Sequence, residues 1–186
     1  MQKLLFSIIF IFLNLSVFSA PKNQVGISLS NISGSGVNFN YYLGNKFHIQ
    51  ATAFPWQSGD EPPHKVNKYL NFGLELQRDF YSDNNYRLFY AAGASRWWLS
   101  KHDYFEKLEN RLLIRINTVE KNDVWNFGLG IGAEKYYLDV LSVGIKLGFN
   151  YQISDKWSGD DFIDHNPEGK IWSGLGIGIS LHYILK

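Results

Sequence analysis

Strict alternation of apolar residues with small or polar ones recurs along most of this sequence. It is clearest at Trp125-Asn-Phe127-Gly-Leu129-Gly-Ile131-Gly. A β-strand points successive side chains to opposite faces, so this period of two predicts strands with one apolar face. Eight segments carry it, at residues 25–30, 37–43, 47–53, 70–77, 88–94, 125–132, 141–150 and 174–183. The sequence therefore predicts an all-β protein of eight strands.

Length, charge and cysteine content exclude several classes of protein. A chain of 186 residues is long enough for one domain and short for two. Its 18 Lys and Arg residues against 17 Asp and Glu leave a net charge of +1 without a dense basic block, so we expect no nucleic-acid partner. Because the chain has no cysteine, disulfides, thiolate metal sites and cysteine nucleophiles are excluded.

The first residues have the pattern of a secretory signal. A short positive segment ending at Lys3 precedes an apolar run from Leu4 to Phe18. The alternative interpretation is a single N-terminal anchor helix, but the run is short for a helix that spans a membrane. Since a proline directly after the cut hinders signal peptidase, we expect cleavage after Ser19 rather than Ala20. The prediction is a cleaved signal at 1–19 and a barrel domain at 20–186.

The connections between the expected strands differ in length according to their side of the sheet. Three are long and polar, at 55–68, 100–123 and 154–169, and they alternate with short ones. All three long connections therefore fall at one end of an antiparallel barrel. Outer-membrane barrels have short periplasmic turns and longer outer loops, and eight strands are enough to close one. We predict an eight-stranded antiparallel up-and-down transmembrane β-barrel with three long outer loops.

Aromatic residues gather near the ends of the expected strands, where Trp and Tyr favour the two membrane interfaces. The alternative is the general preference of aromatic residues for strands. The predicted outer-end residues are Trp56, Tyr69, Trp97, Trp98, Trp125, Tyr151 and Trp172, and the predicted inner-end residues are Tyr41, Tyr42, Tyr81, Tyr86, Tyr136, Tyr137 and Tyr183.

Over residues 25–185 this arrangement resembles the small eight-stranded barrels of bacterial outer membranes, such as outer-membrane proteins A, X and W. The last strand, with Gly178-Ile-Ser-Leu181-His-Tyr183, is similar to the final strand that the barrel-assembly machinery reads in that family. The chain departs from the family pattern by ending in Ile184-Leu185-Lys186. The resemblance implies residence in a bacterial outer membrane, with contacts to its lipids, including lipopolysaccharide.

Four charged residues fall on the strand face opposite the apolar one, so they point inward in a closed barrel. They are Glu75, Arg87, Glu134 and Lys146. Two acids and two bases favour a salt-bridge network that fills the lumen, and the alternative is a gated path for ions or small solutes. The glycines that alternate at 128–132 and 174–178 lack a following helix, so we interpret them as space for lumenal neighbours rather than as a nucleotide loop.

The other polar clusters have weaker chemical patterns. The five histidines are scattered over two inward strand positions and three loops, and the acidic residues of 154–169 match no ordered calcium-loop spacing, so we expect no metal and no cofactor. Ser100-Lys-His102-Asp103 is the one local cluster with the residue types of a lipid A acyl-chain-modifying enzyme. We expect these neighbours in a polar loop not to meet, and we predict no catalytic residues.

The expected function is that of a non-enzymatic outer-membrane barrel with a largely plugged lumen, whose loops serve recognition or envelope support. A lipid A acyl-chain-modifying enzyme, a small-solute pore and a soluble secreted ligand-binding barrel are the alternatives. Within 100–123, the alternation at Leu112, Ile114 and Ile116 favours a hairpin, whereas Phe105, Leu108 and Leu112 have helical spacing. The loop partner is not identified by the sequence.

Overall fold

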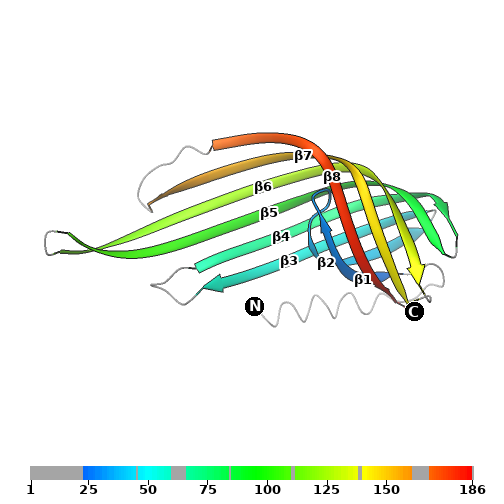
Figure 1. Ribbon diagram of the computed structural model, residues 1–186, viewed down its shortest axis with the longest axis horizontal. Helices are drawn as coiled ribbons and strands as arrows, with labels where there is room; N and C mark the ends of the chain where they lie inside the picture. Colours follow the sequence, from blue (N-terminus) through cyan, green and yellow to red (C-terminus); the bar gives the residue numbers. More distant parts are fainter. Residues whose placement is uncertain are drawn as a thin grey trace.

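The computed structural model of this chain is a closed antiparallel barrel in which eight strands follow one another around the ring in sequence order (Figure 1). It describes residues 23–44, 46–59, 66–83, 85–137, 140–160 and 168–185 apart from 110–111, without the side chains of 103–118, 157–160 and 168. The strands are β1 (Gln24–Ser30), β2 (Gly36–Gly44), β3 (Phe47–Gly59), β4 (Val66–Ser82), β5 (Tyr86–Glu109), β6 (Leu112–Tyr137), β7 (Leu141–Asp160) and β8 (Glu168–Ile184). The fold class predicted from the sequence is confirmed. The expected signal at 1–19 lies outside the described residues.

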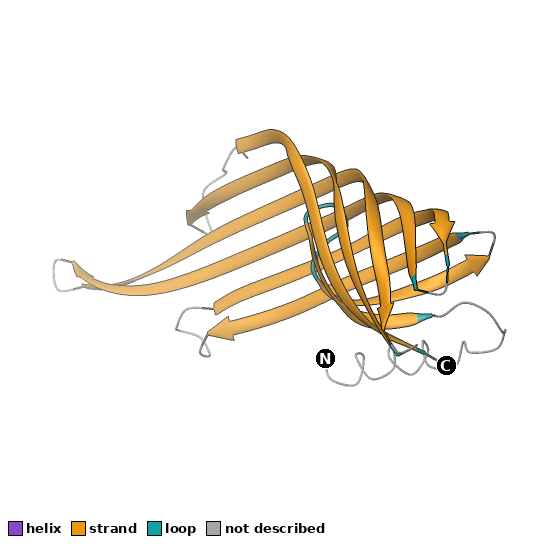
Figure 2. Ribbon diagram, turned by 45° about the vertical axis from the view of Figure 1, so that its right-hand side comes forward, coloured by secondary structure: helices purple, strands orange, loops and turns teal. Residues whose placement is uncertain are grey.

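The barrel closes between its first and last strands. β1 pairs with β8 from Gln24↔Ile184 to Ser30↔Gly178, and every other pair joins strands adjacent in sequence. The short connections at 45–46, 83–85 and 138–140 lie at one end, here called the turn end. At the opposite end, here called the ribbon end, β3 to β8 extend well beyond β1 and β2 (Figure 2).

Alternation along each strand separates an apolar exterior from a polar lumen. On β4 the residues from Asn71 to Phe80 alternate strictly between buried and exposed, with Glu75 and Gln77 inside and Leu74 and Leu76 outside. Such a barrel buries its polar face, which is the reverse of a soluble barrel with an apolar core. Among the described residues, no helix is long and apolar enough to cross a membrane.

The three predicted long loops were placed with the wrong boundaries. Strand pairing continues through most of each, so β3 ends at Gly59, β4 begins at Val66, β7 ends at Asp160 and β8 begins at Glu168. The prolines led to the first error, because we expected Pro55 to interrupt the ladder. Pro55 pairs with Leu70 on β4, but β2 no longer lies on its other side, and a proline is tolerated on such an edge.

The segment 100–123 is a long hairpin rather than a loop or a helix. β5 and β6 pair continuously from Tyr86↔Lys135 to Glu109↔Leu112. The hairpin alternative is therefore correct and the helical spacing was misleading, since the alternation at 112–116 continues a strand. β5 has 24 residues, or about 80 Å of extended chain, so the β5–β6 ribbon projects beyond its neighbours (Figure 1).

Candidate functional site

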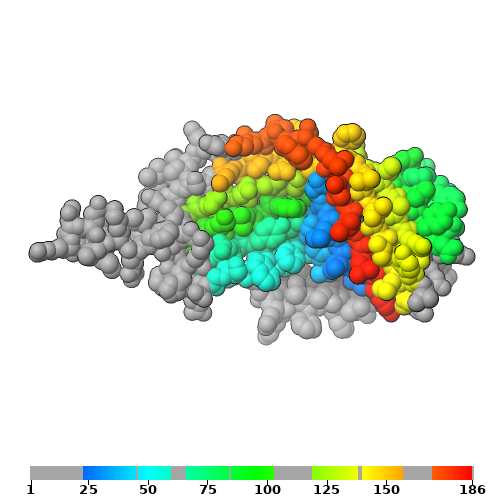
Figure 3. Space-filling model, viewed as in Figure 1, coloured from blue at the N-terminus to red at the C-terminus, as the bar shows by residue number. Residues whose placement is uncertain are grey.

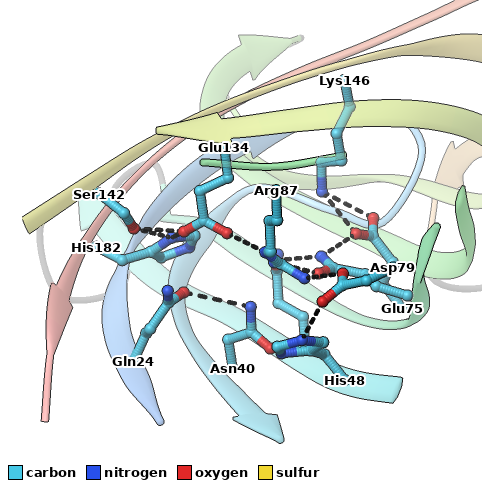
Figure 4. Close-up of polar contacts among 12 residues, drawn as sticks. Gln24, Asn40, His48, Glu75, Asp79, Arg87, Glu134, Ser142, Lys146 and His182 are labelled. Atoms are coloured by element: carbon cyan, nitrogen blue, oxygen red, sulfur yellow. Dashed lines mark hydrogen bonds and ion pairs between the residues drawn. The ribbon is translucent and has the colours of Figure 1, made fainter. Parts of the chain in front are cut away.

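The half of the lumen near the turn end is filled by a polar network centred on Arg87. Its guanidinium donates from Nε to Glu134 Oε2 at 2.6 Å, from Nη1 to Asp79 Oδ1 at 3.0 Å and from Nη2 to Gln77 Oε1 at 2.6 Å. The side chain also lies over the ring of Phe89, 4.4 Å from the ring centroid. Arg87 on β5 therefore joins the two flanking strands, β4 and β6, on the lumenal side of the wall (Figure 4).

A second ion pair continues this network toward the middle of the barrel. Lys146 Nζ on β7 donates to both carboxylate oxygens of Glu75 on β4, at 2.9 and 2.8 Å. Gln77 donates from Nε2 to Glu75 Oε1 at 2.6 Å while accepting from Arg87, so it links the two pairs. Glu75, Arg87, Glu134 and Lys146 are each between 1% and 3% exposed. The structure thus places all four predicted charged residues in the lumen and joins them.

Sequence reasoning missed several members of the network. Asp79 lies two residues beyond Gln77 on the lumenal face and contacts both Arg87 and His48 Nε2, the latter at 3.1 Å. Continuing the alternation past position 77 would have found it, but the expected strand stopped there. With Asp79 the network holds three carboxylates beside Arg87 and Lys146, instead of two. His182 Nδ1 lies 3.1 Å from Glu134 Oε1, which also accepts from the Ser142 hydroxyl.

An inward-folded connection closes the middle of the lumen. The segment Asn31–Gly34 between β1 and β2, here called the inward segment, is seated inside the barrel, and Ile32 and Ser33 have no exposed surface. A Cβ at Gly128 or Gly176 would lie 2.6 or 2.9 Å from the Ile32 side chain, and one at Gly73 would meet the Ser33 carbonyl. Lys146 Nζ also lies 3.3 Å from the Ser33 hydroxyl. Glycines on the surrounding strands therefore make room for the inward segment.

Asn31 completes the backbone pairing of β8 where β1 leaves it. Its N–H donates to the Ile177 carbonyl, its side-chain Nδ2 donates to the Leu175 carbonyl at 3.0 Å, and its Oδ1 accepts from the Ile177 N–H at 2.7 Å. Gly34 follows with φ of +89°, a backbone conformation that side chains rarely adopt. These two residues allow the chain to leave the wall and return to it as β2.

The predicted interface aromatics divide between the two faces of the wall. Strand alternation places eight of them on the exterior and six on the lumenal face. The exterior set is Trp98, Trp125, Tyr151, Tyr41, Tyr81, Tyr86, Tyr137 and Tyr183, and the lumenal set is Trp56, Tyr69, Trp97, Trp172, Tyr42 and Tyr136. Clustering near strand ends in the sequence predicts how high a residue lies along the barrel, whereas strand alternation decides which face of the wall it occupies.

Ser100 and His102 meet, contrary to our expectation. They lie on β5 rather than in a loop, so positions i and i+2 share a face, and Ser100 Oγ is 3.0 Å from His102 Nε2. The side chain of Asp103 lies outside the described residues. Among the residues that are described, no group of three or more His, Cys, Asp or Glu side chains could hold a metal ion.

Comparison with known proteins finds likeness in solved structures alone. No protein-family model matches the chain, and no curated protein matches it. It is similar to a major outer membrane protein of Thermus thermophilus, with 12% identity and a TM-score of 0.49 over 90% of this chain and 100% of that one. It is also similar to Acinetobacter baumannii CarO, with 9% identity and a TM-score of 0.40 over 89% of this chain and 98% of that one. Acinetobacter baumannii CarO2 has 7% identity and a TM-score of 0.40, with coverage of 90% and 100%.

Proposed function

We propose that this chain is an integral protein of a bacterial outer membrane, a sealed barrel that anchors surface-exposed β-ribbons. One observation carries the proposal, namely an apolar exterior around a lumen whose turn-end half is filled with buried polar groups. A soluble protein rarely exposes an apolar surface of this extent. The exterior residues include Ile27, Leu29, Ile49, Leu74, Leu76, Leu129, Ile131, Ile145, Leu147, Leu175, Ile177 and Ile179.

Membrane insertion is tested by extraction and by electrophoretic migration. We expect the protein to stay with the membrane fraction until detergent is added, and we expect unheated samples to migrate differently from heated ones. Recovery in the soluble periplasmic fraction without detergent would falsify the proposal.

Separation of the inner and outer membranes tests the outer-membrane location. Depletion of the barrel-assembly machinery should lower the amount of folded protein.

The packing of the lumen supports a barrel that does not conduct. Ion pairs at the turn end and the inward segment above them leave the predicted charged residues almost without exposed surface. We expect no steady conductance when the purified barrel is added to planar bilayers. A large, steady single-channel current from the unaltered protein would instead favour the small-solute pore.

The long strands support a role for the ribbon end in recognition. Binding function concentrates on segments that a rigid scaffold holds away from its core. We therefore expect a variant without residues 103–118 to insert normally and to lose the binding partner, because pairing up to Lys101↔Glu120 can remain with His102 and Val119 as a two-residue turn. Capture of the partner by immobilised full-length protein but not by this variant is the measurement. Equal capture by both would refute a role for the β5–β6 ribbon.

The contact between Ser100 and His102 favours a second candidate function, an acyl hydrolase acting on membrane lipid. A serine hydroxyl beside an imidazole nitrogen is the nucleophile and base pair of many hydrolases, although these also need an orienting acid. Release of acyl chains from lipid A by the reconstituted protein, abolished by Ser100→Ala, would establish this activity. No release from either protein supports the non-enzymatic function.

A further inference from the structure

The barrel wall lacks two strands over its ribbon half. The last pair between β2 and β3 is Val37↔Ala53, yet β3 continues to Gly59. The last pair between β1 and β8 is Ser30↔Gly178, yet β8 extends back to Glu168. Beyond the inward segment, β3 and β8 therefore face each other as two open edges.

This opening is wide and leads into the lumen. Two missing strands correspond to about three strand spacings, or roughly 14 Å between the axes of β3 and β8. Figure 3 looks toward it, and the green atoms of β5 and β6 are visible between the cyan of β3 and the orange-red of β8, beside the blue β1–β2 hairpin. Residues on both faces of β3 from Phe54 to Gln57 are exposed, as expected of strands at a gap.

The lumen behind the opening is lined by aromatic side chains. Phe54 and Trp56 continue the lumenal face of β3 and stack with their ring planes 6° apart and their centroids 6.2 Å apart. Tyr69 packs edge-on against Phe54 and, on its other side, against Trp97. Trp172 of β8 lies over the lumenal surface of Gly174, where an added Cβ would come within 2.5 Å of the ring. Together these five aromatic residues form what we call the aromatic recess, with Ile32 below it.

Much of this aromatic surface has no protein covering it. Phe54 is 39% exposed, Trp172 51% and Trp56 58%. Leaving apolar surface in water costs about 25 cal/mol per Å², so a water-filled vestibule lined in this way is unfavourable. An apolar occupant would recover that free energy.

The two edges are arranged to face hydrocarbon rather than another strand. The deepest open positions on β8 are Leu175 and Ile177, and Asn31 already bonds their backbone groups. On β3 the corresponding position is Pro55, which has no N–H to donate. A proline also discourages the addition of a further strand to an edge. Ile171 and Leu175 on the outward face of β8 continue the apolar exterior up to the opening.

We propose that the aromatic recess binds an acyl chain of an outer-leaflet lipid, which enters sideways between β3 and β8. This inference rests on the proposed outer-membrane location. The occupant is a hydrocarbon chain because the recess opens at the level of the apolar exterior, presents aromatic faces and is closed below by the inward segment.

The experiment uses tryptophan fluorescence in vesicles whose phosphatidylcholine carries bromine on its acyl chains, since bromine quenches only on contact. The protein has six tryptophans. Three single-tryptophan proteins retain Trp56, Trp172 or the exterior Trp125, with phenylalanine at the other five positions. Heat-dependent migration first verifies that each is folded.

We expect brominated lipid to quench Trp56 and Trp172 to an extent comparable with Trp125, and we expect aqueous acrylamide to quench all three weakly. Quenching of Trp125 by lipid, combined with quenching of Trp56 and Trp172 by acrylamide alone, would mean a water-filled vestibule and would overturn the inference. If lipid fails to quench Trp125 as well, the membrane location itself is wrong.

A charge inside the recess provides a second test. In the protein that retains Trp172, Phe54→Asp should markedly reduce quenching by brominated lipid, because a carboxylate excludes the chain. Gln57→Asp, on the outward face of the same strand, is the matched control and should leave the quenching unchanged. A folded Phe54→Asp protein with undiminished quenching of Trp172 would show that lipid reaches this ring without entering the recess.

Discussion

Three acceptors, on Glu134, Asp79 and Gln77, converge on the guanidinium of Arg87. An ion pair buried in this way adds little stability compared with apolar packing, but the loss of one partner leaves the other charge without compensation. Replacing any one charged residue of the network by an apolar residue should therefore lower the stability of the barrel.

We predict that Arg87→Met lowers the free energy of unfolding by about 3–5 kcal/mol, because Glu134 and Asp79 are left buried without their cation. Urea unfolding in lipid vesicles, followed by tryptophan fluorescence, measures this loss. Arg78→Met is the control, since Arg78 lies on the exterior over the Phe47 ring and should cost about 1 kcal/mol or less. Equal losses for the two variants would contradict a structural role for the lumenal network.

Asp83 in the β4–β5 turn gives a prediction about pH. Hydrogen bonds from the backbone N–H of Tyr86 and Asn85 lower the pKa of its carboxyl group below the ordinary value of 3.8. Because the folded-state pKa is depressed, the stabilisation is complete above the ordinary pKa and is lost as the pH falls through the lowered one. Titration of the Asp83 carboxyl by NMR in micelles should show the lowered midpoint. A midpoint at or above 3.8 would refute the turn geometry.

The inward segment depends on the absence of side chains at glycines of the strands around it. Gly128→Leu should displace Ile32, which we expect to lower stability by about 1–3 kcal/mol through overpacking and to raise the conductance of the barrel in planar bilayers. Gly169→Leu is a matched control, because the nearest atom to its added Cβ is Asp155 Oδ1 at 3.3 Å. If Gly128→Leu changes neither the stability of the barrel nor its conductance, the inward segment does not close the lumen.

The apolar exterior of the barrel should tolerate a charged side chain less well near the membrane midplane than near the interfaces. Leu147 is 53% exposed on the apolar exterior of β7. Leu147→Arg should cost about 2–4 kcal/mol if it lies near the membrane midplane, as charged residues do on the lipid face of such barrels. Ile153→Arg, on the same face nearer the ribbon end, should cost less, about 0–1 kcal/mol near the interface. Unfolding in vesicles measures both, and the reverse order would mean that the barrel is placed wrongly in the membrane.

The amino-acid sequence is enough to predict the eight strands, their antiparallel order and the inward position of Glu75, Arg87, Glu134 and Lys146. These features follow from alternation, a local property that each strand carries whatever its neighbours are. The sequence also indicated that the alternating glycines make room for lumenal neighbours, but it did not identify Ile32 as such a neighbour.

The ends of the strands and the groups that fill the lumen depend on contacts between segments far apart in the sequence. Pro55 is compatible with a strand because β2 has already ended beside it, and Asn31 bonds to β8 across 146 positions of sequence. The pairing of Glu75 with Lys146 and of Arg87 with Glu134, rather than any other combination, depends on the stagger of the strands around the ring. Stagger is a relation between strands, so no single segment encodes it. The face of the wall on which Trp56 and Trp172 lie, and the open edges beside them, follow from the same relation.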